Sequence, residues 1–235
     1  MINRKELKAS AKQQLKGNVL TFFALTLVMG LILGATSISV VAPFILSGPI
    51  LLGITMFLLE VARKGDGEFE TGFNGFKNFG PALVAYLLTT IFIALWSLLL
   101  VIPGIVATFS YSMTFYILAD NPGMSGSEAI KKSKQMMKGH KWELFVLLLS
   151  FFWWYVLCGI TFGIAYIYVA PYINVTMTNF YEKIKLEHDK VQVRDICSVL
   201  SVLDIIIESE LNSSVSHGVD SCIINLLQVA VGHSF

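Results

Sequence analysis

Three long stretches without a charged residue limit what this chain can fold into. They run from Gly17 to Leu59, from Asn78 to Ala119 and from Leu144 to Tyr181. Each holds about 40 residues, which at ~1.5 Å rise per residue makes roughly 60 Å of helix, enough to cross a ~30 Å hydrocarbon core twice. Because a water-soluble surface needs charged and polar side chains, these stretches predict membrane-spanning segments.

A break marked by proline or glycine lies near the middle of each charge-free stretch. The breaks are Pro43 to Pro49, Ile102 to Gly104, and Phe162 to Pro171. Helices satisfy their own backbone hydrogen bonds inside lipid, so each stretch predicts two helices joined as a hairpin. We therefore expect an all-α membrane bundle of six transmembrane helices in three hairpins, with cytoplasmic interfacial helices. The expected spans are 19–41, 44–62, 81–102, 105–119, 144–164 and 167–182.

The lysines and arginines predict how the bundle is oriented. They gather before the first span, between spans two and three, between spans four and five, and after span six, whereas the turns within the hairpins carry no charge. Basic residues favour the cytoplasmic side of a membrane. The sequence therefore predicts a multi-pass protein of the cytoplasmic membrane with both termini in the cytoplasm.

A short basic amphipathic helix is predicted between spans four and five. Ser125 and Glu128 have the spacing of a capping box, and Gly139 is placed to end the helix. The segment Asn3 to Lys16 has a similar character, with Leu7, Ala11 and Leu15 on one face. Positive charge at the membrane surface attracts anionic lipid headgroups, although topology alone also explains it. The candidate lipid contacts are Lys131, Lys132, Lys134, Lys138 and Lys141.

The segment from Ala129 to Phe145 resembles the signature of a bacterial integral-membrane family labelled only as domain of unknown function 975. Further segments are similar to the same family: Asn3 to Lys8, Gly75 to Gly80, Ile102 to Ile105, Tyr111 to Pro122 and Pro171 to Asn174. The resemblance covers roughly residues 1–185 and implies the bacterial inner membrane. A weaker similarity links the chain to membrane domains of glycerophosphodiester phosphodiesterases. No activity or functional residue follows, because the family has no established activity.

Two small-xxx-small patterns predict close approach between helices. Gly30 with Gly34, and Gly159 with Gly163, favour close packing within the chain over homodimerisation. Short segments that recur before and within the hairpins suggest a threefold parallel repeat. They are Lys16 to Asn18, Lys77 to Gly80 and Lys138 to His140, then Ile54 to Met56, Tyr111 to Met113 and Val175 to Met177.

The last part of the chain, residues 186–235, differs in composition from the membrane domain, residues 1–185. From Val191 onward the sequence contains one arginine and five acidic residues, and apolar side chains recur at helical spacing. We expect an acidic amphipathic cytoplasmic tail of two helices, with a turn at 212–218. Such a tail suits contact with a partner protein or a second copy, or it is a poorly ordered end.

Catalytic and metal-binding patterns are absent from the sequence. Cys158, Cys197 and Cys222 have no paired spacing, and the four histidines are isolated. No acidic or basic residue falls at the middle of a predicted span, which disfavours an ion-coupled transporter. We therefore expect no enzymatic activity, no cofactor, no metal and no nucleic-acid partner.

Three functions of different classes are consistent with this pattern. The first is a non-enzymatic membrane protein that organises lipid or partner proteins through its basic helices. The second is a permease for a small neutral or amphiphilic solute, and an intramembrane enzyme comes last because no nucleophile–base pair is present. For the permease, the candidate polar lining is Ser112, Thr114, Asn174, Thr176 and Thr178, whose other role is hydrogen bonding between helices.

Overall fold

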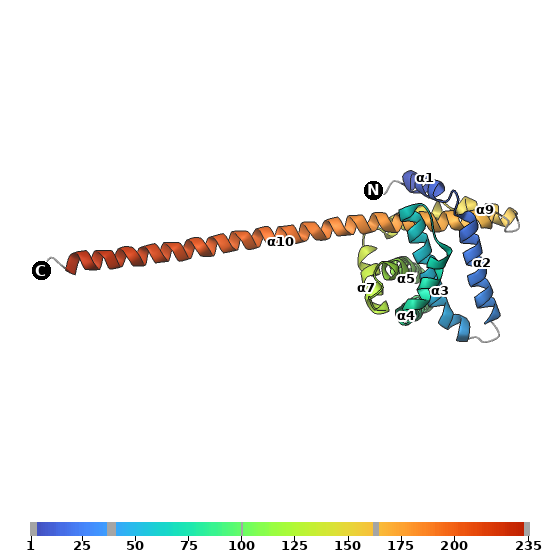
Figure 1. The fold of residues 1–235 in the computed structure, drawn as a ribbon, viewed down its shortest axis with the longest axis horizontal. Coiled ribbons are helices and arrows are strands. Elements are labelled where there is room, and N and C mark those ends of the chain that lie inside the picture. The colour runs from blue at the N-terminus through green and yellow to red at the C-terminus, as the bar shows by residue number, and fades with distance from the viewer. Residues whose placement is uncertain (1–3, 37–40, 100, 162–164, 233–235) are drawn as a thin grey trace. The chain divides into compact units, whose positions relative to one another are not determined.

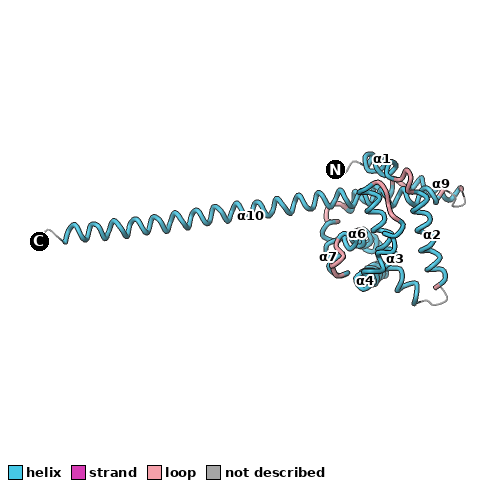
Figure 2. Tube along the Cα trace, viewed as in Figure 1, coloured by secondary structure: helices cyan, strands magenta, loops and turns pink. Residues whose placement is uncertain are grey.

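The computed structural model describes residues 4–36, 41–99, 101–161 and 165–232, and every regular element in these ranges is a helix (Figures 1 and 2). The chain divides into two compact units, Met1–Lys185 and Leu186–Phe235. The prediction of an all-α protein is therefore confirmed for the described residues. The helices are α1 (Arg4–Gln14), α2 (Val19–Ala35), α3 (Val41–Lys64), the 3₁₀ helix η1 (Phe69–Asn78), α4 (Phe79–Leu99), α5 (Val101–Tyr111), α6 (Thr114–Asp120), α7 (Gly126–Met136), α8 (Lys141–Leu149), α9 (Phe152–Ile160) and α10 (Tyr166–Gly232).

Several of these helices are long and apolar enough to cross a membrane. Within the described residues there are four such stretches, Val41–Lys64, Phe69–Leu99, Ile102–Asp120 and Lys141–Ile160. A fifth results if α1 and α2, which are bent by 83° at their junction, are counted as one span. Apolar helices of this length are typical of a multi-pass membrane protein.

The first predicted break is placed wrongly. We expected a turn at Pro43 to Pro49, but α3 begins at Val41 and contains both prolines. Likewise Pro103 and Gly104 lie inside α5 rather than in a turn. Proline is compatible with apolar helices because neighbouring helices and side chains satisfy the carbonyls that it leaves unbonded. Residues 37–40, where α2 and α3 are joined, lie outside the described part of the chain.

Spans four and five are each divided into two shorter helices. Α break at Ser112 separates α5 from α6, and a break at Ser150 separates α8 from α9. The hydroxyl of Ser112 donates to the carbonyl of Phe109, and that of Ser150 donates to Leu147. Serine hydroxyls that bond to the preceding helical turn commonly bend helices, which accounts for both breaks.

The predicted sixth span forms the beginning of α10 and is more polar than the other spans. It carries Asn174, Thr176, Thr178 and Asn179, of which the last three are buried. Burial within the first unit explains how a segment of this polarity packs among apolar helices. The tail turn expected at 212–218 is wrong, because α10 continues through those residues to Gly232.

Close glycine packing occurs, but at positions other than those expected. A Cβ built at Gly30, Gly34 or Gly159 would meet no atom from elsewhere in the described chain within 4 Å, so the expected close packing is wrong there. Gly163 lies outside the described residues. Instead, backbone meets backbone where η1 crosses α3: a Cβ at Gly53 would overlap Gly72. Only glycine permits this approach.

Two segments of the first unit share one pattern of burial. We align Gly17 on Gly139 without a gap; both glycines have a positive φ, 98° and 89°. Six buried side chains in α1 and α2 then coincide with six buried side chains in and around α7 and α8. They pair as Leu7 with Ala129, Ala11 with Ser133, Leu15 with Met137, Phe22 with Leu144, Leu25 with Leu147, and Met29 with Phe151.

The same alignment extends into the helices that follow. Pro49 in α3 coincides with Pro171 in α10, and Glu60 coincides with Glu182. We call the short helix before each hairpin, together with the apolar helix that follows it, the lead-in of that segment. The lead-in of the middle segment differs because it begins with η1, a 3₁₀ helix whose glycines pack against α3. The structural similarity is therefore between the first segment of the expected repeat, which contains α1 to α3, and the third segment, which contains α7 to α9 and the beginning of α10.

Candidate functional site

A cluster of charged side chains joins the ends of α3 and α6 to the first part of α10. Its centre is Asp120, the last residue of α6, whose side chain is only 5% exposed. Arg63 donates from Nη2 to Asp120 Oδ1 at 2.7 Å and from Nε to Glu182 Oε1 at 2.9 Å. The other Asp120 oxygen accepts hydrogen bonds from Lys185 Nζ at 2.6 Å and Tyr181 OH at 2.8 Å. Both carboxylate oxygens are thus occupied by partners on α3 and α10.

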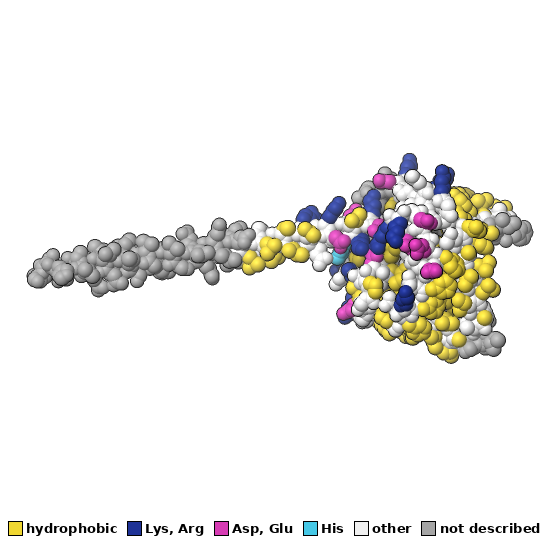
Figure 3. Space-filling view, in the orientation of Figure 1, with side chains coloured by type: hydrophobic (Ala, Val, Ile, Leu, Met, Phe, Trp, Pro, Cys, Tyr) yellow, Lys and Arg dark blue, Asp and Glu magenta, His cyan; other side chains and the backbone are white. Residues whose placement is uncertain are grey.

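A shallow recess of about 250 Å³ lies beside this cluster. Glu60 lines it and accepts hydrogen bonds from Lys64 Nζ at 2.8 Å and Thr71 Oγ1 at 2.6 Å. The second contact links α3 to η1. Figure 3 shows one face of the molecule, on which charged side chains gather in one part and hydrophobic side chains cover an adjoining part. Since the acids and bases of the recess already pair with one another, it offers no unbalanced charge to a ligand.

Uncharged amides extend the same network to α1 and α2. Gln14 donates to the carbonyl of Ala62 at 2.8 Å and accepts from Asn179 at 2.8 Å. Asn18, which is 3% exposed, donates to the carbonyl of Gly65 at 2.8 Å and accepts from the N–H of Gly67 at 3.3 Å. These bonds tie the bend between α1 and α2 to the end of α3 and to α10.

The ion pairs and hydrogen bonds of this cluster hold helices together, and we call the cluster the clasp. Among the described residues, no three His, Cys, Asp or Glu side chains come together in a way that could hold a metal ion. Charge-assisted hydrogen bonds to a nearly buried carboxylate are strong, and removing one partner leaves the other charge buried and uncompensated, which is destabilising. The cluster therefore fixes the relative positions of α3, α6 and the beginning of α10.

Sequence reasoning missed this clasp. From the sequence alone, the positions of Glu60, Asp120 and Glu182 at the ends of predicted spans two, four and six indicate only helix capping or interfacial charge. The available signal was their shared position at the ends of alternate spans, with Arg63 and Lys185 three residues after Glu60 and Glu182. Pairing across 57 to 65 sequence positions, as in the Arg63 and Lys185 bonds to Asp120, cannot be read from that spacing.

The basic helix α7 has two distinct faces. Its buried face includes Ala129, Ile130 and Ser133, and the Ser133 hydroxyl donates to the carbonyl of Ser110 at 2.9 Å. The predicted capping box is confirmed, because Ser125 and Glu128 exchange both of its hydrogen bonds. Of the five lysines named above, three lie on the other sides of α7, Lys138 follows its end and Lys141 begins α8. Lys131, Lys134 and Lys138 are exposed, and Lys132 and Lys141 are partly exposed.

Among the cavities described for residues 4–36, 41–99, 101–161 and 165–232, none is lined by all five residues expected to line a polar path. Ser112, Thr114, Thr176 and Thr178 each donate a hydrogen bond to a carbonyl three or four residues earlier in the chain. Asn174 likewise donates to the carbonyl of Ala170, but it also borders a pocket between α2, α3 and α10. The described cavities thus include one of the five, and the hydroxyls of the other four bond to the preceding turn of the chain.

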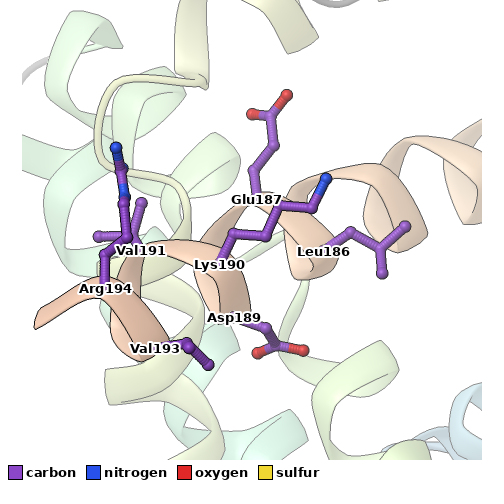
Figure 4. Close-up of a pocket in the computed structure, with 7 residues that line it drawn as sticks. All are labelled: Leu186, Glu187, Asp189, Lys190, Val191, Val193 and Arg194. Carbon is purple, nitrogen blue, oxygen red and sulfur yellow. The ribbon is translucent and has the colours of Figure 1, made fainter. Parts of the chain in front are cut away.

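A hollow along the tail is lined by residues of a single helix. The labelled side chains in Figure 4 all project from one stretch of α10, and they point to different sides of it. A hollow of this kind does not enclose a ligand. The prediction that the tail contacts a partner protein or a second copy stays a prediction. The lining residues are Leu186, Glu187, Asp189, Lys190, Val191, Val193 and Arg194.

Comparison with known proteins defines the class to which this chain belongs. Its sequence matches the family described as "Protein of unknown function (DUF975)" over residues 1–107 and 97–188. The chain belongs to this family, as its motifs suggested. No curated protein and no solved structure matches it. The similarity to phosphodiesterase membrane domains therefore stays an expectation.

Proposed function

We propose that this chain is a six-span protein of the bacterial cytoplasmic membrane that gathers anionic lipid headgroups at the cytoplasmic surface and has no enzymatic activity. The observation that carries this proposal is the two-faced placement of α7. Its apolar face is buried, while Lys131 and Lys134 of α7 and Lys138 just after it are exposed. Within the described residues none of these three lysines forms a salt bridge with an acidic side chain, although Lys131 is attracted to Glu128 at longer range. The charges of Lys134 and Lys138 are therefore available to lipid phosphates.

The corresponding positions of α1 support the same role. In the alignment of Gly17 on Gly139, Lys12 falls on Lys134 and Lys16 falls on Lys138, and all four side chains are exposed. Each lysine close to an anionic membrane surface contributes about 1 kcal/mol of attraction. Two basic lead-in helices with this placement would gather more anionic lipid than either helix alone.

The six-span arrangement with cytoplasmic termini is part of the proposal. It is supported by the four or five helices long enough to span, by the buried beginning of α10, and by the lysines and arginines that flank the apolar stretches. A permease has less support, because the hydroxyls of four of the five polar side chains expected to line a path bond to carbonyls of the preceding turn.

The proposal is tested by measuring which lipids the full-length protein retains. The protein would be purified from vesicles of phosphatidylglycerol and phosphatidylcholine, and the bound lipids counted by native mass spectrometry. Replacing Lys134 and Lys138 with glutamine removes about 2 kcal/mol of attraction, so the preference for phosphatidylglycerol should fall at least tenfold.

The matched control replaces Lys190 and Arg194, an exposed basic pair on the tail, with glutamine. This control should leave the lipid preference within about twofold of the wild type. A reporter fused to the C-terminus shows whether either variant has changed its orientation. The proposal is rejected if the Lys134 and Lys138 variant keeps its lipid preference, because those lysines would then serve topology alone.

A further inference from the structure

A pocket lies between α2, α3 and the beginning of α10, away from the charged clasp and from the basic face of α7. It has a volume of about 250 Å³. Phe23 and Leu51, which are 36% and 40% exposed, are among the lining residues, so the pocket is reached from the side of the helices. The rest of the apolar lining comes from Phe22, Ile54, Tyr166, Ile167, Ala170 and Pro171, and Thr26 also borders it.

Hydrogen-bond acceptors border this apolar pocket at its α10 wall. Pro171 has no N–H, so it cannot donate to the carbonyl of Ile167 four residues earlier. Asn174 donates through Nδ2 to the carbonyl of Ala170 at 2.9 Å, which leaves its side-chain oxygen as an acceptor. The hydroxyl of Thr26 already donates to the carbonyls of Phe22 and Phe23. The α10 wall therefore offers two acceptors that suit a hydroxyl or an amine.

The corresponding proline of the first segment lines none of the pockets described for this part of the chain. Both prolines are buried, but a Cβ built at Gly75 of η1 would overlap the Pro49 carbonyl and the backbone of Gly53. The 3₁₀ helix therefore fills the space next to Pro49. Pro171 instead borders the open pocket, so the two corresponding prolines differ in what packs against them.

We infer that this pocket binds the apolar chain of a single-chain amphiphile from the bilayer, with a hydroxyl or amine of its head group donating to Ile167 and Asn174. Small-molecule sites combine an apolar lining with a few fixed polar groups, and this pocket has both. Its volume of about 250 Å³ is slightly below the usual range for such sites, roughly 300–1,000 Å³, which suits one chain rather than a two-chain lipid. The apolar surroundings favour an occupant that partitions into the membrane. This site uses none of the lysines on which the lipid-gathering role rests.

The test uses the full-length protein in phosphatidylcholine vesicles and a long-chain alcohol that carries a photoreactive diazirine in its chain. We expect saturable cross-links to residues 22–26, 51–54 and 166–174, mapped by mass spectrometry. Unlabelled alcohol should compete with these cross-links. Labelling spread evenly over the exposed apolar surface, with no saturation, would overturn the inference.

Two substitutions separate a true site from general contact with lipid. Ala170→Trp fills the pocket and should reduce the saturable cross-links at least fivefold, whereas Ala24→Trp adds the same bulk at an exposed position of α2 and should not. Asn174→Leu should lower the preference for the alcohol over the matching alkane about fivefold, the equivalent of one neutral hydrogen bond. If Ala170→Trp does not fold, competition on the wild-type protein decides, and unchanged labelling in the presence of competitor contradicts the site.

Discussion

The lead-in formed by α1 and α2 and the lead-in formed by α7 and α8 have the same arrangement, which therefore occurs twice in this chain. In each, a short basic helix ends near a glycine with positive φ, Gly17 or Gly139, and an apolar helix follows. Exposure agrees in detail: Phe23 and Phe145 are 36% and 37% exposed, and Leu27 and Leu149 are 47% and 57% exposed. The buried and exposed faces are therefore set by the position within the repeat and not by local composition alone.

The two lead-ins differ at the residue after the glycine. Asn18 is buried and bonds to the chain after α3, whereas His140 is partly exposed and lies 3.1 Å from Glu143 of its own helix. The apolar helices differ as well, since α2 runs unbroken to Ala35 while its counterpart divides at Ser150. The shared backbone pattern thus leaves individual positions to serve different contacts.

The largest predicted effect tests whether the two buried faces are equivalent. Leu25 and Leu147 occupy the same position and are both 0% exposed. Replacing either with alanine should lower the free energy of unfolding by about 3 kcal/mol, because each substitution leaves a cavity in packed surroundings. Reversible unfolding of the purified protein in mixed detergent micelles would measure both losses.

The matched controls are Leu27→Ala and Leu149→Ala, the exposed leucines two residues further along. Each should change the free energy of unfolding by less than about 0.5 kcal/mol, the usual limit for surface substitutions. The two segments are not equivalent if the losses in unfolding free energy for Leu25→Ala and Leu147→Ala differ from each other by more than the loss at a buried leucine differs from the loss at an exposed one.

A second prediction concerns the position at which the segments differ. Asn18→Ala should cost about 2 kcal/mol, because it leaves the Gly65 carbonyl and the Gly67 N–H without their partner. His140→Ala should cost about 0.5 kcal/mol, as is typical of a partly exposed ion pair. The same unfolding measurement compares them, and equal losses would show that our distinction between the two positions is wrong.

A third prediction tests the glycines themselves. Gly17→Ala and Gly139→Ala should each cost about 1 kcal/mol, because alanine disfavours a positive φ. A Cβ at either position would meet nothing within 4 Å, so crowding adds no further cost. Asparagine tolerates this conformation, and Gly→Asn at the same sites should therefore be milder than Gly→Ala. An asparagine as costly as alanine would contradict a conformational origin.

How far the sequence predicted this structure depends on whether a feature is local. The charge-free stretches predicted apolar helices, and Ser125 with Glu128 predicted a capping box, because both depend on neighbouring residues. The contact of Arg63 with Asp120 needs helices brought together by tertiary packing. Pro49 was misplaced in a turn because the local rule for proline does not include the surroundings that accommodate it inside a helix.

The same distinction applies to the sites. The lysines of α7 were predicted from amphipathic spacing, and their exposure agrees with that pattern. The pocket beside Pro171 could not be predicted, since it depends on α2 and α3 leaving space against α10. Asn174 was named for its polarity alone, and its hydrogen bond to Ala170 shows why polarity within a span does not by itself indicate a solute path.

The smallest predicted effect separates the two lead-ins by their dependence on pH. Hydrogen bonds from Ser125 hold the pKa of Glu128 below its ordinary value, since they stabilise the ionised carboxylate. A carboxyl group whose pKa is lowered by folding contributes stability above its unfolded pKa of about 4.3 and loses it as the pH falls through the folded value. The thermal midpoint of the wild type should therefore fall more between about pH 6 and pH 3 than that of Glu128→Gln.

Glu6 is the counterpart of Glu128 in the first lead-in, and its carboxylate lies 3.8 Å from Lys183 on α10. Glu6→Gln should therefore retain the part of the acid sensitivity that Glu128→Gln removes. Ser125→Ala should reduce that part without abolishing it, because the backbone N–H of residue 125 still donates to Glu128. If Ser125→Ala keeps the full wild-type response, the sensitivity does not come from the cap. The expected contrast between Glu128→Gln and Glu6→Gln would show that α7 is stabilised by its own cap, whereas α1 is held by contacts with α3 and α10.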